Sequence, residues 1–243
     1  MKFQIIVEGP SERAYVQRLM SFLESELPLD EDGFSSRLVL YQTITNDRIG
    51  GGSFNLVSRT FRDIAPANRK MPVVIWVDRD IYIRNSNHRE RASSAGYANK
   101  GSLPDFNFSV MNFEDFLALH FDDEFFVRWR NAFDMRHHFE VPLHSEEYDE
   151  LWQSIWKEFV SVHPDVGQGA YKKGTLPEGF ITIESLKNVQ RHLNDPKMAK
   201  LFAEHSSVDT PTFPVWLIGS LSRFYPDQFA IGGRGVISNN LKL

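Results

Sequence analysis

Cysteine is absent from the 243 residues of this chain. Its absence excludes disulfide bonds, zinc sites with thiolate ligands and cysteine nucleophiles. Long apolar runs are absent as well, because no stretch of about 18 consecutive apolar residues occurs and the first residues lack a signal-peptide pattern. We therefore expect a soluble, cytoplasmic protein that does not engage a membrane.

An excess of positive charge is also lacking, since the formal net charge is -5 at pH 7. This balance argues against a protein that coats nucleic acid, although a local basic surface could still hold a phosphate backbone. The segment 79–100 is basic, whereas residues 104–150 are acidic, with clusters at 122–124 and 146–150. An ordinary solvated surface explains the same distribution, so both interpretations stay open. The basic residues of the first segment are Arg79, Arg84, Arg89, Arg91 and Lys100.

Several catalytic motifs are missing too. The eight histidines show no HExxH or similar zinc spacing. Ser53 follows three glycines but stands in no GxSxG motif, and no GK[ST] follows that turn to make a phosphate-binding loop. These absences argue against a zinc hydrolase, a serine hydrolase and a nucleotide triphosphatase of the Walker type.

The residues that are present predict an α/β fold. Hydrophobic residues make up 42% of the chain and include 20 Phe, which is enough for an aromatic-rich core. Strands are expected at 3–7, 37–43, 73–77 and 106–111, with helices at 10–27, at 54–64 and from Phe113. This alternation favours a doubly wound, mainly parallel sheet flanked by helices.

After residue 125 the pattern becomes mainly helical. Helices are expected at 145–161, 183–194 and 196–205, with another apolar stretch at 213–224 and a mobile tail after Ile231. We therefore predict two regions, a metal-binding domain at 1–125 and a mainly helical region at 126–243.

Two acidic motifs follow predicted parallel strands. Glu8-Gly9-Pro10-Ser11-Glu12 comes after the first strand, and Asp78-Arg79-Asp80 comes after the strand at 73–77. Ligand sites of open α/β sheets form outside the carboxyl ends of the strands, so these carboxylates should converge. Converging carboxylates repel each other, and a hard divalent cation such as Mg²⁺ relieves that repulsion. The alternative is that Glu8 and Glu12 only complement the start of a helix.

These motifs carry a family resemblance. IIVEGPSE at 5–12, followed by VVIWVDRD at 73–80, resembles the toprim domain of topoisomerases, DnaG-type primases and the OLD- and RloB-like nucleases. The resemblance covers residues 1–125, about half of the chain. It implies a site for Mg²⁺ or Mn²⁺ built from Glu8, Asp78 and Asp80, with Glu12 close by.

Two further segments narrow the resemblance to stand-alone RloB-like and OLD-type proteins. Residues 112–121, NFEDFLALHF, are similar to a stretch of RloB-like proteins, although Phe116 stands where that family often has Trp and a preceding Pro is absent. Glu114 is thereby implied as a further metal ligand; alternatively it is an exposed residue beside a packing face. Lys172 and Lys173 are implied as a basic element near the scissile phosphate, unless they are ordinary solvated lysines.

The leading functional hypothesis is a metal-dependent nuclease that cuts DNA or RNA. Glu8 would act as general base or as a shared metal ligand, and the basic segment 84–100 would grip the nucleic-acid backbone. The RloB-like resemblance implies a role in bacterial defence against phage. The implied partners are nucleic acid, an ATPase that gates the activity, and a second copy of the chain.

Two other functions remain open. A DxD-type nucleotide-sugar or phosphotransfer enzyme would use Asp78 and Asp80 to hold a Mg²⁺-diphosphate, but it leaves Glu8 and Gly9 unexplained. The other alternative is a binding module that has the toprim-like fold but catalyses no reaction. Topoisomerase and primase are disfavoured, because the chain has no room for a gate with a tyrosine nucleophile and no zinc module.

Overall fold

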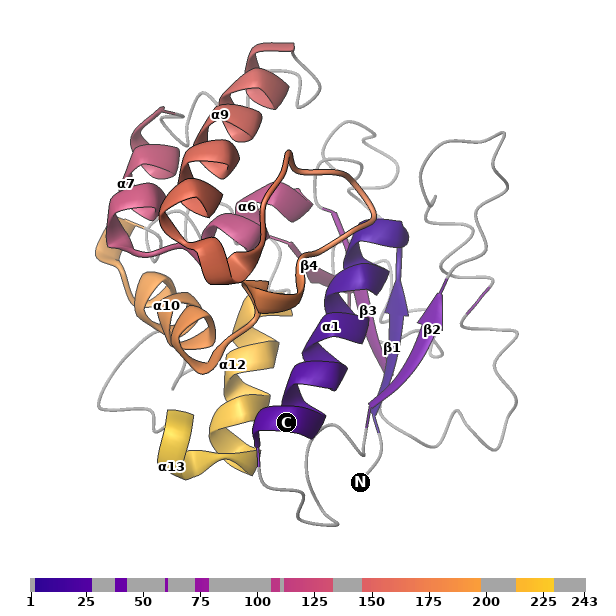
Figure 1. The fold of residues 1–243 in the computed structure, drawn as a ribbon. Helices are drawn as coiled ribbons and strands as arrows, with labels where there is room; N and C mark the ends of the chain where they lie inside the picture. The colour runs from indigo at the N-terminus through magenta and orange to yellow at the C-terminus, as the bar shows by residue number, and fades with distance from the viewer. Residues whose placement is uncertain are drawn as a thin grey trace.

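The computed structural model describes residues 3–27, 38–42, 60, 73–78, 106–109, 112–132, 146–197 and 213–229. Within these residues the protein is a mixed α/β structure, mostly helical, with one small parallel sheet (Figure 1). The strands are β1 (Phe3–Val7), β2 (Leu38–Gln42), β3 (Val73–Val77) and β4 (Phe106–Phe108). The helices are α1 (Pro10–Glu26), α6 (Phe113–Ala118), α7 (Asp123–Ala132), α9 (Glu146–Val162), η3 (Pro164–Val166), η4 (Glu178–Phe180), α10 (Ile183–Leu193), α12 (Phe213–Phe224) and α13 (Pro226–Phe229).

The four strands pair in the order β2-β1-β3-β4, and all pairs are parallel. The strands expected at 3–7 and 73–77 have the predicted bounds, and the strand expected at 37–43 is one residue shorter at each end. The strand expected at 106–111 ends at Phe108. β2 lies on one side of β1, whereas β3 and β4 lie on the other side. The order in which strands are added therefore reverses between β1 and β3, while all strands stay parallel.

One face of the sheet joins the helical core. Val7 pairs with Trp76 and Ile5 pairs with Val74, and all four belong to the hydrophobic core cluster. The alternate residue Ile6 is fully buried on the opposite face. The described residues thus establish a mixed α/β fold with one helix-covered face, and the doubly wound, toprim-like arrangement stays a prediction.

Helix α1 packs on the core face of the sheet. Pro10 opens the helix at a position that needs no N–H donor, and buried residues such as Tyr15 and Leu19 form its apolar side. The Tyr15 ring meets the Trp76 ring edge to face, with centroids 5.6 Å apart. The ring of Phe213, from α12, stacks on the Trp76 ring with the centroids 3.7 Å apart.

The predicted helical character of the second half is present. The helices expected at 145–161 and 183–194 correspond to α9 and α10, and the apolar stretch at 213–224 is α12. Buried aromatic residues line the inner side of α9, where Trp152 stacks on Phe121 at 5.6 Å. The helices expected at 54–64 and 196–205 lie mostly outside the described residues, as does the tail after Ile231.

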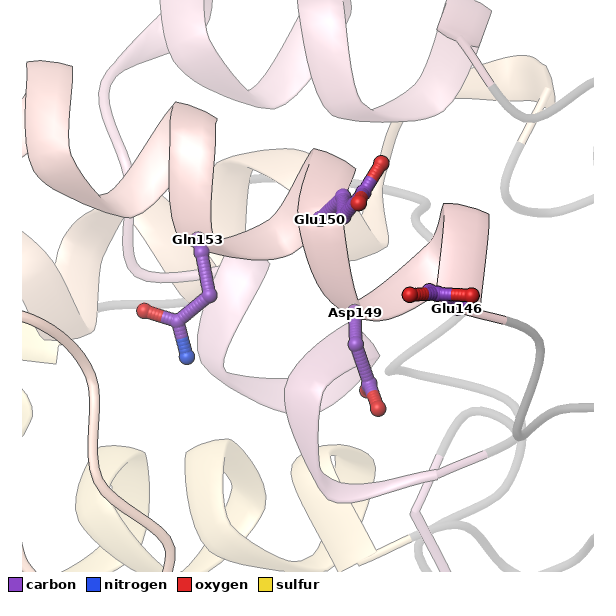
Figure 2. A pocket seen from close by; sticks show the side chains of 4 residues that line it. All are labelled: Glu146, Asp149, Glu150 and Gln153. Carbon is purple, nitrogen blue, oxygen red and sulfur yellow. The ribbon is translucent and has the colours of Figure 1, made fainter.

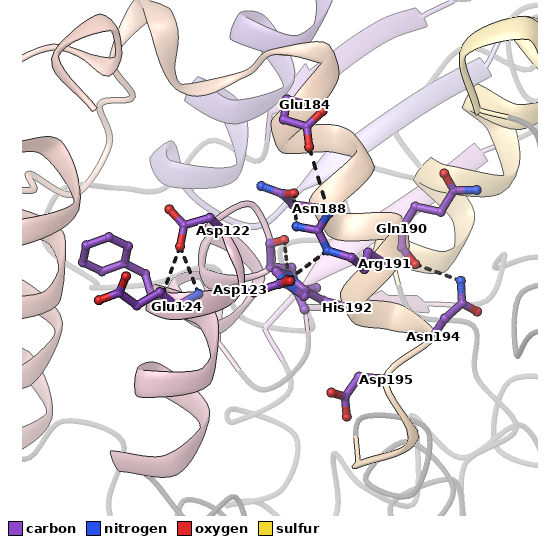
Figure 3. A network of polar contacts seen from close by, with 12 residues as sticks. Asp122, Asp123, Glu124, Glu184, Asn188, Gln190, Arg191, His192, Asn194 and Asp195 are labelled. Carbon is purple, nitrogen blue, oxygen red and sulfur yellow. Dashed lines mark hydrogen bonds and ion pairs between the residues drawn. The ribbon is translucent and has the colours of Figure 1, made fainter. Parts of the chain in front are cut away.

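A single core runs across the predicted domain boundary. Residue 125 lies inside α7, and one hydrophobic cluster includes residues from Ile5 to Phe229. Helices α7 and α10 are also joined by polar contacts, because Asp123 Oδ1 lies 2.8 Å from Arg191 Nε and 3.0 Å from His192 Nε2 (Figure 3). The division at residue 125 stays a prediction.

None of the described helices combines the length and the apolar character that a membrane span requires.

Candidate functional site

The two predicted strand-end motifs meet at the carboxyl edge of the sheet. Glu8 directly follows β1, and its backbone N–H donates to the Trp76 carbonyl oxygen at 3.2 Å, which extends the ladder between β1 and β3. The Glu8 side chain is 5% exposed, and its Oε2 accepts a hydrogen bond from the Asp78 backbone N–H at 3.0 Å. The structure thus brings Glu8 and Asp78 together, although 70 residues separate them in the sequence.

Glu12 lies in the first turn of α1 and is also buried. Its Oε2 accepts a hydrogen bond from the Gly9 backbone N–H at 3.1 Å, as expected for an acidic residue that caps a helix start. Glu12 therefore does complement the start of a helix, which was the alternative to a role in metal binding. A carboxylate can accept more than one hydrogen bond, so this contact is compatible with a second role at the site.

Glu114 is buried in the first turn of α6, next to the sheet edge. A capping box fixes this turn, because Asn112 Oδ1 accepts from the Asp115 N–H at 3.0 Å and Asp115 Oδ2 accepts from the Asn112 N–H at 3.2 Å. Asp115 Oδ1 also accepts from the Trp129 indole N–H at 3.2 Å. The expectation that Glu114 is exposed beside a packing face is therefore wrong, because the whole turn is packed into the core.

The predicted lysines lie on an irregular segment between η3 and η4, residues 167–177, which we name the 171 loop. Its Gly174 N–H donates to Ser11 Oγ at 3.0 Å, in the first turn of α1. Figure 1 shows this orange segment passing beside the start of α1, at the edge toward which the strand arrows point. The second half of the chain thereby supplies Lys172 and Lys173, both exposed, to the neighbourhood of the acidic residues.

Lys173 is the cation that the described structure sets closest to a predicted ligand. Its Nζ lies 3.9 Å from Glu114 Oε1, and the Lys173 side chain is 60% exposed whereas that of Glu114 is 8% exposed. Burial raises the pKa of Glu114, and the positive charge of Lys173 partly opposes that increase. A buried carboxylate of this kind is stabilised in its charged form by a nearby cation.

Burial and the negative charge of this region both raise the pKa values of two tyrosines, Tyr148 and Tyr171. Burial raises the pKa of the Tyr171 phenol, and the carboxylates of Glu114 and Glu12 raise it further. Burial likewise raises the pKa of Tyr148, with additional contributions from Asp115 and Glu114. Each tyrosine therefore lies within electrostatic range of more than one carboxylate.

The donor chemistry fits a hard divalent cation. All predicted ligands offer carboxylate oxygens, which are the atoms that Mg²⁺ and Mn²⁺ prefer. Among the described residues, which do not include Asp80, no group of three or more acidic, histidine or cysteine side chains is arranged to hold a metal ion. Arg79 and the basic segment 84–100 also lie outside the described part of the chain. The metal site therefore stays a prediction, because the four predicted ligands that the structure describes, Glu8, Glu12, Asp78 and Glu114, do not form such a group by themselves.

His120 is a residue of the core and not of the candidate site. It is 1% exposed, and its Nε2 lies 2.8 Å from the Tyr15 hydroxyl.

A separate hollow lies at the start of α9 and has a volume of about 570 Å³ (Figure 2). Three of its lining residues are acidic, as is usual at the start of a helix, where negative charge complements the helix dipole. The lining residues that the structure describes include no predicted site residue. They are Glu146, Asp149, Glu150 and Gln153.

Sequence reasoning missed the residues that support this site. The capping box of Asn112 and Asp115 has a recognisable N-x-x-D spacing and could have been found. The contacts of Ser11 with the 171 loop and of Tyr148 with Asn112 could not, because each joins distant segments without a motif. Tyr148 receives a hydrogen bond from Asn112 Nδ2 at 2.7 Å.

Comparisons of the chain with protein-family models, with curated proteins and with solved structures give no match.

Proposed function

We propose that this chain is a Mg²⁺-dependent nuclease of the toprim class, which hydrolyses phosphodiester bonds of DNA or RNA. One observation carries the proposal: Glu8 and Asp78 follow β1 and β3 and are joined by a 3.0 Å hydrogen bond. With the strand order β2-β1-β3-β4, these two strands flank the point at which the chain reverses across the sheet. Ligands of open α/β sheets bind at such a point, outside the carboxyl ends of the strands.

The proposed metal ligands are Asp78, Asp80 and Glu114, with Glu12 orienting them. Glu8 is the proposed general base or a ligand shared between two metals, because its buried carboxylate is held against the backbone of Asp78. A bound divalent cation would supply water activation and neutralise charge on the transferring phosphoryl group. The proposed fold around this site is the doubly wound toprim-like sheet.

Lys172 and Lys173 are proposed to stabilise negative charge on the phosphoryl oxygens. The position of Lys173, 3.9 Å from Glu114, supports this role, since it sets a cation at the edge of the acidic site. The basic segment 84–100 is proposed to contact the nucleic-acid backbone, and the helical second half to bind a gating ATPase. We further propose a role in defence against phage, on the resemblance to RloB-like proteins.

The deciding experiment is a calorimetric titration of Mn²⁺ and Mg²⁺ into the wild-type protein and into Glu8→Gln and Asp78→Asn. Both substitutions are isosteric and remove one negative charge, and the amide introduced by Glu8→Gln keeps an oxygen for the Asp78 N–H. Removing a direct ligand should weaken metal binding by at least about tenfold, since even residues behind the ligands change affinity by that factor.

Asp149→Asn is the matched control, because Asp149 is an exposed acidic residue on α9. It removes the same charge outside the site, so it should leave the affinity within about twofold of the wild type, because an exposed charge at a distance is screened by salt. Equal loss in Asp149→Asn would show that bulk charge, not the strand-end site, binds the metal. No binding by the wild type would favour the binding-module hypothesis instead.

Activity is tested with Mn²⁺ on DNA, tRNA and other RNA, with Asp78→Asn as the inactive reference. Cleavage by the wild type and at least about a hundredfold loss in the variant would support the nuclease, since that loss corresponds to about 2.7 kcal/mol of transition-state stabilisation. Thermal stabilisation by nucleotide sugars, without cleavage of any nucleic acid, would favour the DxD-type transferase.

A further inference from the structure

The 171 loop forms hydrogen bonds with both α1 and α9. On the α9 side, the Trp156 indole N–H donates to the Gly169 carbonyl oxygen at 3.2 Å, and Gln153 Nε2 donates to the Tyr171 carbonyl oxygen at 3.1 Å. The Tyr171 ring packs edge to face against two rings of α9, with its centroid 5.4 Å from that of Trp152 and 5.3 Å from that of Trp156. The backbone before Lys173 is therefore held in place.

The other end of the loop is held by α1. The Gly174 N–H donates to Ser11 Oγ, and Arg18 Nη2 donates to the Leu176 carbonyl oxygen at 3.3 Å. Gly174 has φ +82°, and a Cβ added there would contact Pro10 at 3.4 Å, so the loop approaches the start of α1 closely. Because both flanks are anchored, the Cα of Lys173 has a fixed position while its long side chain does not.

Lys173 and Glu114 differ in their freedom to move. The Glu114 carboxylate is buried within a capped turn, whereas the Lys173 ammonium ends a flexible, 60% exposed side chain. A buried carboxylate needs a compensating charge, and Lys173 supplies one at 3.9 Å. A divalent cation at the Glu114 carboxylate would repel the Lys173 ammonium. Because the Glu114 side chain is buried and that of Lys173 is exposed, the lysine is the residue that can move away.

We propose that Lys173 is the resident counter-cation of Glu114 and that it competes with the divalent cation for this carboxylate. The proposal rests on the proposed metal site and adds a regulatory property to it. Lys173 lowers the metal affinity of the free protein and moves outward when metal binds. The ammonium is then released toward the exposed edge of the site, where a phosphate would lie.

The test is a Mn²⁺ titration by calorimetry on the wild type, Lys173→Met and Lys172→Met, without nucleic acid. Lys173→Met should bind Mn²⁺ about fivefold more tightly, the change expected if one partly exposed ion pair no longer competes. Lys172→Met removes the same charge from the neighbouring position and should stay within about twofold of the wild type, as expected of an exposed charge that is screened by salt. Lys173→Arg keeps the charge and should keep the wild-type affinity.

A second comparison ties the effect to Glu114. In a Glu114→Gln background, Lys173→Met should give no further gain in affinity, because the carboxylate for which the two cations compete is gone. Unchanged or weaker binding by Lys173→Met would overturn the proposal, and so would an equal gain in Lys172→Met.

The outcome separates this proposal from the proposed function. If Asp78→Asn abolishes binding while Lys173→Met gives no gain, the metal site stands and the competition is refuted. If Asp78→Asn has no effect on Mn²⁺ binding, the metal site itself is refuted. If neither the wild type nor Lys173→Met takes up Mn²⁺, both proposals are refuted.

Discussion

His120 is a fully buried histidine with both ring nitrogens engaged. Nε2 lies 2.8 Å from the Tyr15 hydroxyl, and Nδ1 lies 3.2 Å from the Phe116 carbonyl oxygen. Burial lowers the pKa of His120 to about 3. The ring is therefore neutral at neutral pH, with Nδ1–H donating to Phe116 and Nε2 accepting from Tyr15.

This histidine predicts an acid dependence of stability. The folded pKa is lower than the unfolded value of about 6.5, so the unfolded chain takes up the proton first. The stabilising effect of the neutral ring is complete above pH 7 and is lost as the pH falls from about 6.5 toward 3, by up to about 1.4 kcal/mol per pH unit. Urea unfolding of His120→Gln at pH 7, 6 and 5 should therefore show a flatter pH dependence than that of the wild type.

Tyr15→Phe is the matched control for His120→Gln, because it removes the hydroxyl partner and keeps the buried imidazole. It should lower the free energy of unfolding at every pH by about 1 kcal/mol without flattening the dependence. Equal slopes in His120→Gln and the wild type would show that another group causes the acid loss.

Single residues also show what the sequence could reveal about the site. The convergence of Glu8 and Asp78 was predictable, because parallel strands bring their carboxyl ends to one edge and the strand lengths were clear. The resemblance implied that Lys172 and Lys173 lie near the scissile phosphate, but it did not indicate the contact of Lys173 with Glu114. The contact of Ser11 with Gly174 had no sequence signal, since 163 residues separate the partners and no motif links them.

At the scale of elements, η3 and η4 pack so closely that only glycine fits at position 179. A Cβ added to Gly179 would overlap the backbone oxygen of Asp165 in η3. η3 directly precedes the 171 loop and η4 directly follows it. The contact between these two helices therefore sets the distance between the two ends of the loop. The loop position therefore depends on a backbone contact and not only on its side-chain hydrogen bonds.

Gly179→Ala should accordingly lower the free energy of unfolding by at least about 2 kcal/mol, because the overlap involves backbone atoms that cannot rotate away. Urea denaturation measures this cost. Glu178→Ala is the neighbouring control: its side chain is 90% exposed and pairs with Arg18 at 3.3 Å, so the cost should be under about 1 kcal/mol. A Gly179→Ala protein as stable as the wild type would refute the close packing of η3 on η4.

Regular elements were more predictable than the segments between them. The strands at 3–7 and 73–77 and helices α9 and α10 have strong apolar patterns, and their bounds agree with the prediction within one or two residues. The strand at 106–111 was predicted too long. After Phe108 the Ser109 hydroxyl accepts from the Trp76 indole N–H at 2.9 Å, which is a side-chain contact without a periodic signal. The 171 loop has no periodicity at all.

At the scale of the whole molecule, the aromatic residues join the two predicted regions. Trp76 of β3 and Phe213 of α12 stack with centroids 3.7 Å apart and an angle of 5° between the rings. The abundance of Phe predicted an aromatic core but not which regions share it, because composition carries no information about pairing. A shared core makes independent unfolding of residues 1–125 unfavourable, since their separation would expose this stack.

We therefore expect one cooperative unfolding transition, with tryptophan fluorescence and far-UV circular dichroism giving coincident urea curves. Phe213→Ala should lower the free energy of unfolding by about 3–5 kcal/mol, since it removes a buried aromatic ring, and both probes should shift together. Val162→Ala is the control, because Val162 is 58% exposed and its truncation should cost less than about 0.5 kcal/mol. Mn²⁺ added in excess should move the single transition to higher urea, as binding to the folded state stabilises all of it. Two separate transitions, with Phe213→Ala shifting only the second, would instead establish two independent domains and confine the proposed metal site to the first.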